Sequence, residues 1–183
     1  MGLQLIFVVE TNKSCKSDWI YIKDTIDYFY QYDPAHTKLS PVYMDGKGRY
    51  KNKEKEILKL IAEYASGSVS KSNQSKVVYC FDCDDCKTKP EDSKFLEEAR
   101  QYCKEKHYDF VWFYKDIECV YLGKKVDDSK KKKEAEQFKG KKLIKNADAN
   151  KLSVQNYVTN TSNIMKVIDQ YLTRREQEIS YPL

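Results

Sequence analysis

The sequence lacks a long hydrophobic segment. The apolar stretch at its start, GLQLIFVV, is interrupted by Glu10 and is too short to span a bilayer. No basic segment precedes this stretch, so it also lacks the composition of a secretory signal. We therefore expect no membrane partner and a cytoplasmic location, in which the six cysteines are reduced thiols.

Glycine motifs for nucleotides and clusters of histidine are missing as well. The pattern GxxxxGK[ST] does not occur, which excludes a P-loop NTPase at the level of the motif. The GKG sequence at Gly46 to Gly48 is followed by Lys51, where a dinucleotide-binding motif has its third glycine, so a Rossmann cofactor site is not indicated. The two histidines, His36 and His107, lie near the ends of predicted helices without the spacing of metal ligands.

What the sequence does have is a charged composition with one lysine-rich segment. Its 183 residues include 33 basic and 28 acidic residues, which gives a net charge of +5. Ten lysines and only four acidic residues lie between Lys124 and Lys145, so the rest of the chain is nearly neutral. Such a segment is either a solvated loop or a surface that binds a polyanion such as nucleic acid.

Strands and helices are predicted to alternate along the first two thirds of the chain. Short apolar runs predict the strands, and apolar residues at three- and four-residue spacing predict the helices between them. The predicted strands are Leu3–Val9, Leu39–Met44, the segment from Lys76 and Asp109–Tyr114, and the predicted helices begin near Ser17, Asn52 and Pro90. This alternation predicts an α/β core with a mostly parallel sheet of four to five strands flanked by helices.

Three regions are expected along the chain. Residues 1–125 form the α/β core, residues 126–150 a lysine-rich loop, and residues 151–183 a C-terminal helical segment that packs on the core. In the last region Ile164, Met165 and Ile168 recur at helical spacing. A chain of 183 residues is long enough for one domain with such an appendage.

Acidic residues follow two of the predicted strands. Glu10 follows the first strand, and the segment KVVYCFDCDDC runs into Asp82, Asp84 and Asp85. Parallel sheets bind ligands beyond the carboxyl ends of their strands, so these acids can meet at one edge. Residues two apart on a strand project to the same side with Cα atoms roughly 6–7 Å apart, which would let Asp82 and Asp84 share Mg²⁺ or Mn²⁺. The alternative is a solvated acidic turn that only ends the strand.

The order of these elements resembles the TOPRIM domain of topoisomerases, primases and OLD-type nucleases. The matching segments are LIFVVE with Glu10, VYMDGKG with Gly46 and Gly48, and VVYCFDCDD with Asp82 and Asp84. The segment DFVWFYKDIECVYLG, which contains Glu118, looks like the strand and acidic helix start of the small bacterial RloB-type TOPRIM proteins. The resemblance covers about residues 1–125 and implies a TOPRIM-like, Rossmann-like fold.

This resemblance implies a metal-dependent nuclease, or a related phosphoryl-transfer enzyme, that acts on nucleic acid in bacterial or phage defence. By the same resemblance Asp82 and Asp84 ligate the metal, and Glu10 ligates it or serves as an acid or base. We add Asp85 to the metal-binding set and Glu118 as an accessory ligand. The basic residues expected to hold nucleic-acid phosphates are Lys47, Arg49, Lys124, Lys125, Lys130, Lys131, Lys132 and Lys133.

Two alternatives stay open. Thr11 stands where the family glutamate is usually followed by glycine, which favours a non-catalytic TOPRIM-like module that binds nucleic acid or a protein partner. A homodimer is compatible with either function. Cys80, Cys83 and Cys86 form a CxxCxxC pattern of the kind that binds zinc or iron–sulfur clusters, but the carboxylates between these thiols suit a harder cation.

Overall fold

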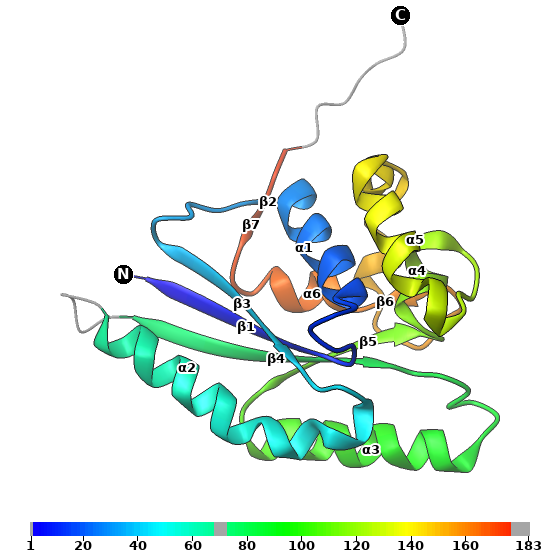
Figure 1. Ribbon diagram of the computed structural model, residues 1–183, viewed down its shortest axis with the longest axis horizontal. Coiled ribbons are helices and arrows are strands. Elements are labelled where there is room, and N and C mark those ends of the chain that lie inside the picture. Colours follow the sequence, from blue (N-terminus) through cyan, green and yellow to red (C-terminus); the bar gives the residue numbers. More distant parts are fainter. Residues whose placement is uncertain (1, 68–72, 177–183) are drawn as a thin grey trace, which may run out of the picture.

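A five-stranded sheet forms the centre of the fold (Figure 1). The computed structural model describes residues 2–67 and 73–176. Across the sheet the strands are β3 (Thr37–Tyr43), β1 (Leu3–Val9), β4 (Gln74–Asp82), β5 (Asp109–Tyr114) and β6 (Thr161–Ser162). The first four strands are parallel, and β6 is antiparallel to β5. The predicted α/β fold with a mostly parallel sheet is therefore confirmed.

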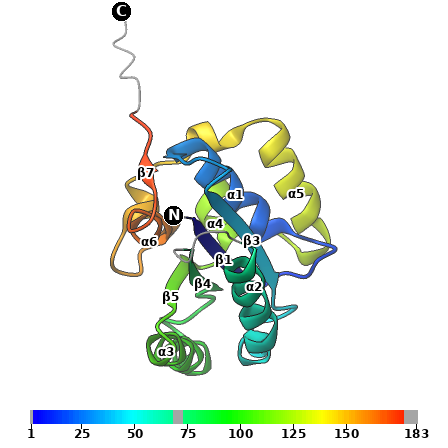
Figure 2. The same ribbon diagram turned by 90° about the vertical axis from the view of Figure 1, so that its left-hand side faces the viewer.

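Helices cover both faces of this sheet (Figures 1 and 2). They are α1 (Ser17–Phe29), α2 (Glu54–Ser66), α3 (Pro90–Glu105), α4 (Ile117–Leu122), α5 (Asp128–Gly140) and α6 (Ile164–Ile168). Helices α2 and α3 lie on one face, and the other helices lie on the opposite face. Each face has its own hydrophobic core, because successive side chains of a strand point to opposite sides. On β1, Phe7 belongs to the core beneath α1 and α5, and Val8 to the core above α2 and α3.

The lysine-rich segment is a helix and not the loop that its composition suggests. Helix α5 spans Asp128–Gly140, and the 3-10 turns η2 (Leu143–Asn146) and η3 (Lys151–Ser153) follow it. Ala135 and Phe138 are buried, and the Phe138 ring docks α5 against Tyr21 of α1 and Tyr121 of α4. The prediction of a loop over residues 126–150 was wrong because two buried side chains are enough to dock a helix whose other residues are mostly solvated.

The C-terminal segment is less helical than its apolar spacing predicts. Among residues 151–176, α6 is the only α-helix, and the chain between the 3-10 turn η3 and β6 has no regular structure. Asn163 completes the edge of β5 with its side-chain amide, which accepts from the Trp112 N–H at 2.9 Å and donates to the Phe110 carbonyl at 2.9 Å. A second small sheet joins β2 (Tyr30–Gln31) to β7 (Thr173–Arg174). The last part of the predicted segment, residues 177–183, lies outside the described residues.

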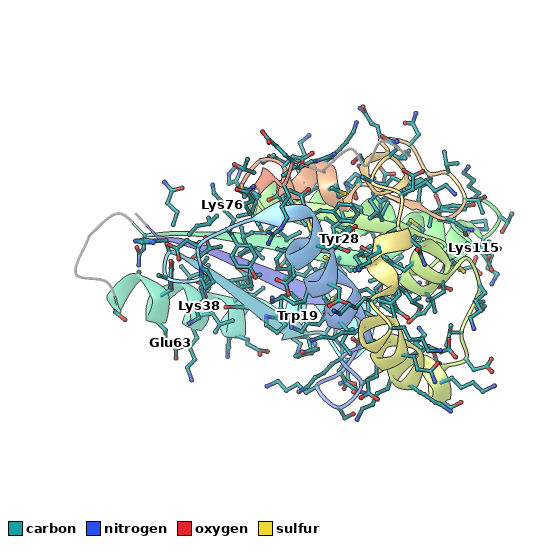
Figure 3. The ribbon with its side chains drawn as sticks, turned by 90° about the horizontal axis from the view of Figure 1, so that it is seen from above. Trp19, Tyr28, Lys38, Glu63, Lys76 and Lys115 are labelled. Atoms are coloured by element: carbon teal, nitrogen blue, oxygen red, sulfur yellow. The ribbon has the colours of Figure 1, made fainter. Side chains whose placement is uncertain are left out.

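The loops at the carboxyl ends of the parallel strands are held together by backbone hydrogen bonds. The Gly46 N–H donates to the Glu10 carbonyl at 2.9 Å, and Gly46 has a φ of 107°, which glycine adopts without strain. The 3-10 helix η1 (Lys47–Lys53) follows this turn. The Cys83 N–H donates to the Phe113 carbonyl at 2.9 Å. In Figure 3, Lys115, which follows β5, marks this end of the molecule, and Glu63 of α2 lies at the opposite end.

None of the helices in the described ranges is both long and apolar enough to cross a membrane.

Candidate functional site

Four carboxylates from four different elements gather at the carboxyl edge of the sheet. Glu10 directly follows β1, Asp82 is the last residue of β4, and Glu118 lies in the first turn of α4. The fourth, Asp18, lies in the first turn of α1. Asp18 is 6% exposed and Glu118 is fully buried, whereas Glu10 and Asp82 are half-buried. Negative charges this close together in a buried place repel one another, so the cluster needs protons or cations to be stable.

Backbone N–H groups fix three of these carboxylates. Glu10 accepts a hydrogen bond at its Oε1 from the Asp82 N–H at 2.8 Å, which links the ends of β1 and β4. Asp82 in turn accepts at Oδ1 from the Ile117 N–H, the first residue of α4, at 2.9 Å. Asp18 accepts at Oδ2 from the Thr11 N–H at 3.0 Å. The side chains are therefore positioned by the same connections that join the strands to their helices.

Glu118 has no such partner. Neither of its carboxylate oxygens accepts a hydrogen bond from any described residue, although the side chain is fully buried. Its one charged contact within the described part of the chain is the ammonium group of Lys131, whose Nζ lies 3.7 Å from Glu118 Oε2. Buried polar groups are almost always satisfied, so an orphaned carboxylate in a cluster of acids marks a place that suits a hard cation.

Lys131 is the cation that the chain itself supplies to this cluster. Its side chain is only 21% exposed, and its Nζ also lies 3.4 Å from Asp128 Oδ1. Burial alone would lower the pKa of Lys131, but the charges of Glu118, Asp82 and Asp18 outweigh burial and raise it. The ammonium therefore stays charged and is directed inward, whereas Lys130, Lys132 and Lys133 are exposed.

Burial raises the pKa of all four carboxylates. Burial raises the pKa of Glu10 to about 8, although the hydrogen bond from the Asp82 N–H lowers this pKa. The negative charges of Asp18 and Asp84 raise it further. It also raises the pKa of Glu118 to about 7, with Lys131 acting in the opposite direction. The pKa values of Asp18 and Asp82 are raised mainly by burial as well. Near neutral pH the cluster consequently shares protons instead of carrying four full negative charges.

Asp84 and Asp85 are paired with lysines, although the charge of Asp84 still acts on Glu10. Asp84 has a φ of 48°, so the chain has left the extended conformation after Asp82 and the strand alternation that would place both side chains on one side no longer applies. Lys47 forms a salt bridge with Asp84, and its Nζ lies 3.3 Å from Asp92. Asp85 forms salt bridges with two lysines, Lys89 at 3.0 Å and Lys115 at 3.2 Å.

The donor atoms of the cluster suit a divalent cation, but the side chains do not already surround one. Within residues 2–67 and 73–176 no three acidic, cysteine or histidine side chains are placed so that they could hold a metal ion together. This finding includes Cys80, Cys83 and Cys86, of which the first lies inside β4. An ion among Glu10, Asp82 and Glu118 would therefore require movement of these carboxylate side chains.

A hollow of about 350 Å³ lies beside the loop after β4, although none of the four carboxylates of the cluster lines it. Residues of the loop after β4 and of the start and end of α4 line it, together with Asn160. Lys124 and Lys125 also line it; Lys124 forms a salt bridge with Glu134 at 3.1 Å, whereas Lys125 is exposed and has no ion pair with a described residue. Of the other predicted basic residues, Arg49 is paired with Asp45 at 2.7 Å.

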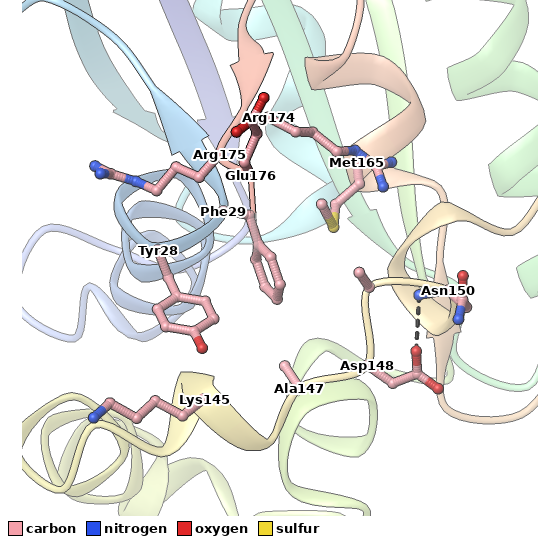
Figure 4. Close-up of a pocket in the computed structure, with 11 residues that line it drawn as sticks. Tyr28, Phe29, Lys145, Ala147, Asp148, Asn150, Met165, Arg174, Arg175 and Glu176 are labelled. Atoms are coloured by element: carbon pink, nitrogen blue, oxygen red, sulfur yellow. Dashed lines mark hydrogen bonds between the residues drawn. The ribbon is translucent and has the colours of Figure 1, made fainter. Parts of the chain in front are cut away.

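A larger hollow, of about 790 Å³, lies at the other end of α1 (Figure 4). Tyr28 and Phe29 line it, ten residues along α1 from Asp18, which corresponds to about 15 Å of helix. Its Arg174 is bound to Asp169 at 2.6 Å, and its Asp148 accepts from the Asn150 N–H at 2.8 Å. No buried acidic residue in the described ranges lines this larger hollow, so we place the candidate site at the cluster of Glu10, Asp18, Asp82 and Glu118.

Sequence reasoning missed one residue of the site, Asp18, and gave a second, Lys131, a role in binding phosphates instead of its place beside Glu118. From the sequence, Asp18 can be interpreted as a helix cap. In the structure it lies on the buried side of α1 with Ile22, and its carboxylate accepts a hydrogen bond from the Thr11 N–H in the turn after β1. Lys131 looks like one lysine among many. Its spacing of four and seven residues from the two buried residues of α5, Ala135 and Phe138, is the signal that places it on the inner face of the helix.

Comparison of the chain with models of protein families, with curated proteins and with solved structures found no match.

Proposed function

We propose that this protein is a divalent-metal-dependent phosphoryl-transfer enzyme, and specifically a nuclease that hydrolyses phosphodiester bonds of nucleic acid. The observation that supports this best is the buried cluster of four carboxylates with an orphaned Glu118 at the carboxyl edge of the sheet. The position of Glu10 after β1 and of Asp82 at the end of β4 agrees with the TOPRIM-like pattern of the sequence, and we propose a TOPRIM-type core on that basis.

In this proposal Asp82 and Glu118 hold Mg²⁺ or Mn²⁺, with Asp18 next to them. The ion, when bound, neutralises charge on the phosphate and lowers the pKa of an attacking water. Glu10 has a pKa of about 8, raised by burial, so near neutral pH it is largely protonated and can give a proton to the leaving oxygen. Asp84 and Asp85 are then part of the loop that positions Asp82 and are not ligands of the same ion.

The nucleic acid would lie along the exposed lysines next to the cluster. Lys125, Lys132 and Lys133 are exposed and have no ion pair with any residue in the described ranges, so they are available to phosphates. Lysine contacts to phosphates release counterions and provide affinity without sequence preference. The substrate class supported by this arrangement is therefore a nucleic-acid backbone, DNA or RNA.

The test is cleavage of single- and double-stranded DNA and RNA with and without Mg²⁺ or Mn²⁺. We expect product only with the metal, and we expect Asp82→Asn to reduce the cleavage rate by about a hundredfold or more, because it removes charge where the phosphate is activated. The matched control is Asp148→Asn, the same change at an exposed residue of the larger hollow, which should cleave like the unmodified protein. Equal rates in Asp82→Asn and the control would contradict the proposal.

A second candidate function is a binding module that cuts nothing. One observation favours it: Lys131 already supplies positive charge to the acidic cluster, so the fold is stable in principle without a metal. If no substrate gives a metal-dependent product while nucleic acid still binds with a steep salt dependence, this second function is the correct one.

A further inference from the structure

Helix α5 holds the Lys131 ammonium in the acidic cluster by packing. Lys131, Ala135 and Phe138 lie on one side of the helix, and the last two are buried. The Phe138 ring packs edge-on against Tyr21 of α1, with ring centroids 4.9 Å apart, and against Tyr121 of α4 at 5.7 Å. Phe138 thus contacts α1, which contributes Asp18, and α4, which contributes Glu118. Helix α5 therefore packs directly on the two helices that carry these acidic residues.

The ammonium serves several carboxylates at once. Lys131 lowers the pKa of Asp18, of Asp82 and of Glu118, whereas on Glu10 the opposing lysine is Lys47. A divalent ion in the cluster would need the oxygens of the same residues, above all the two unbonded oxygens of Glu118. Two cations within about 4 Å of one another in a partly buried site repel strongly, so the ammonium and the metal cannot both take this place.

We propose that Lys131 and the divalent metal compete for the acidic cluster, and that Lys131 must leave it before the metal enters. This inference rests on the proposed metal-dependent function and specifies how that site is regulated. The lysine side chain is a flexible stem that ends in a compact charge, and 21% of its surface is already exposed, so it can turn outward toward the other lysines of α5 while the helix stays docked.

The first experiment measures Mn²⁺ binding by isothermal titration calorimetry in Lys131→Gln and Lys131→Met. Both variants remove the competing charge and keep most of the stem. We expect each to bind Mn²⁺ at least about tenfold more tightly than the unmodified protein. Lys132→Gln is the matched control, because it removes the same charge from an exposed position of the same helix, and it should bind like the unmodified protein. Lys131→Arg keeps the charge and should not bind more tightly.

A second measurement uses the unmodified protein and does not depend on a variant that folds. The Lys131 amine is treated with an acylating reagent, and its modification rate is followed by mass spectrometry with and without Mn²⁺. We expect Mn²⁺ to accelerate modification of Lys131, since the side chain leaves the cluster, and to leave Lys132 unchanged. A rate at Lys131 that does not change while Mn²⁺ is bound overturns the competition.

The possible results separate this inference from the function on which it rests. If the unmodified protein binds Mn²⁺, Asp82→Asn does not, and the Lys131 variants bind no more tightly than the unmodified protein, only the competition is overturned. If neither the unmodified protein nor the Lys131 variants bind Mn²⁺, the inference and the proposed metal site are both wrong.

Discussion

Glu118 is the residue with the least usual surroundings, since it is fully buried and accepts no hydrogen bond from the described part of the chain. Its pKa is raised to about 7 in the folded protein by burial, from an ordinary value near 4.5. Between these two pH values the folded chain holds a proton that the unfolded chain has lost. The free energy of unfolding therefore falls as the pH rises through this window, and the penalty is complete above about pH 7.

Replacing Glu118 by Gln should remove this penalty. We expect the free energy of unfolding of Glu118→Gln, relative to the unmodified protein, to rise by about 1–3 kcal/mol between pH 4.5 and pH 7.5 in the presence of a chelator. Urea unfolding at several pH values measures this difference. Glu97→Gln, at an exposed position of α3, is the control and should show no such trend. A difference that does not change with pH would contradict the raised pKa that burial gives Glu118.

For individual residues, the sequence predicts part of the candidate site. Glu10 and Asp82 follow apolar strands, and parallel pairing brings them together, as the hydrogen bond between Glu10 and the Asp82 N–H shows. Asp84 could not be placed in the same way, because its left-handed backbone ends the alternation of the strand. The inward direction of Asp18 depends on helix packing across the chain, which local patterns do not contain, whereas Lys131 could be placed only once Ala135 and Phe138 were known to form the buried side of α5.

Helix α5 is the element whose role the composition hides. Phe138→Ala should lower the free energy of unfolding by about 3–5 kcal/mol, because it removes the aromatic contacts with Tyr21 and Tyr121 and leaves a cavity. Gln137→Ala, at the neighbouring exposed position, should change it by less than about 0.5 kcal/mol. Urea unfolding of both variants is the measurement. A loss below about 1 kcal/mol in Phe138→Ala would mean that α5 is not docked as described.

The other elements show why some boundaries can be predicted. Strands β1 and β5 have the predicted bounds, Leu3–Val9 and Asp109–Tyr114, because each is mainly apolar, with Gln4 and Asp109 as the polar exceptions, and is followed by polar residues. Helix α3 begins at the predicted Pro90. The start of α2 was predicted near Asn52, but that residue belongs to the 3-10 helix η1, and α2 begins at Glu54. Tight turns of this kind differ from α-helix in hydrogen bonding and not in composition.

Over the whole molecule, positive charge is unevenly placed relative to the sheet. Helix α5 and the loop before it carry Lys125, Lys132 and Lys133 on the face opposite α2 and α3. Neutralising these three lysines to Gln should weaken binding of a fluorescent single-stranded oligonucleotide and reduce the slope of log affinity against log salt by about 2, since each phosphate contact contributes a little under one unit. Anisotropy titrations between about 50 and 200 mM salt measure both quantities.

The control for this experiment uses lysines of the other face. Lys59 of α2 and Lys94 of α3 are exposed and lie across the sheet from α5. Their neutralisation to Gln should leave the salt slope almost unchanged. An equal loss of slope per lysine removed in both sets of variants would show that binding follows the total charge of the protein and not the face that carries α5.

The side chain of Asn163 covers part of the outer edge of β5. Its amide occupies hydrogen-bonding groups on the outer side of β5, at Trp112 and Phe110, where a parallel sheet would otherwise present an open row of donors and acceptors. Open rows of this kind are templates for aggregation. The C-terminal segment therefore covers this edge of β5. A fragment of the protein that ends before Asn163 would expose the strand edge and should aggregate more readily.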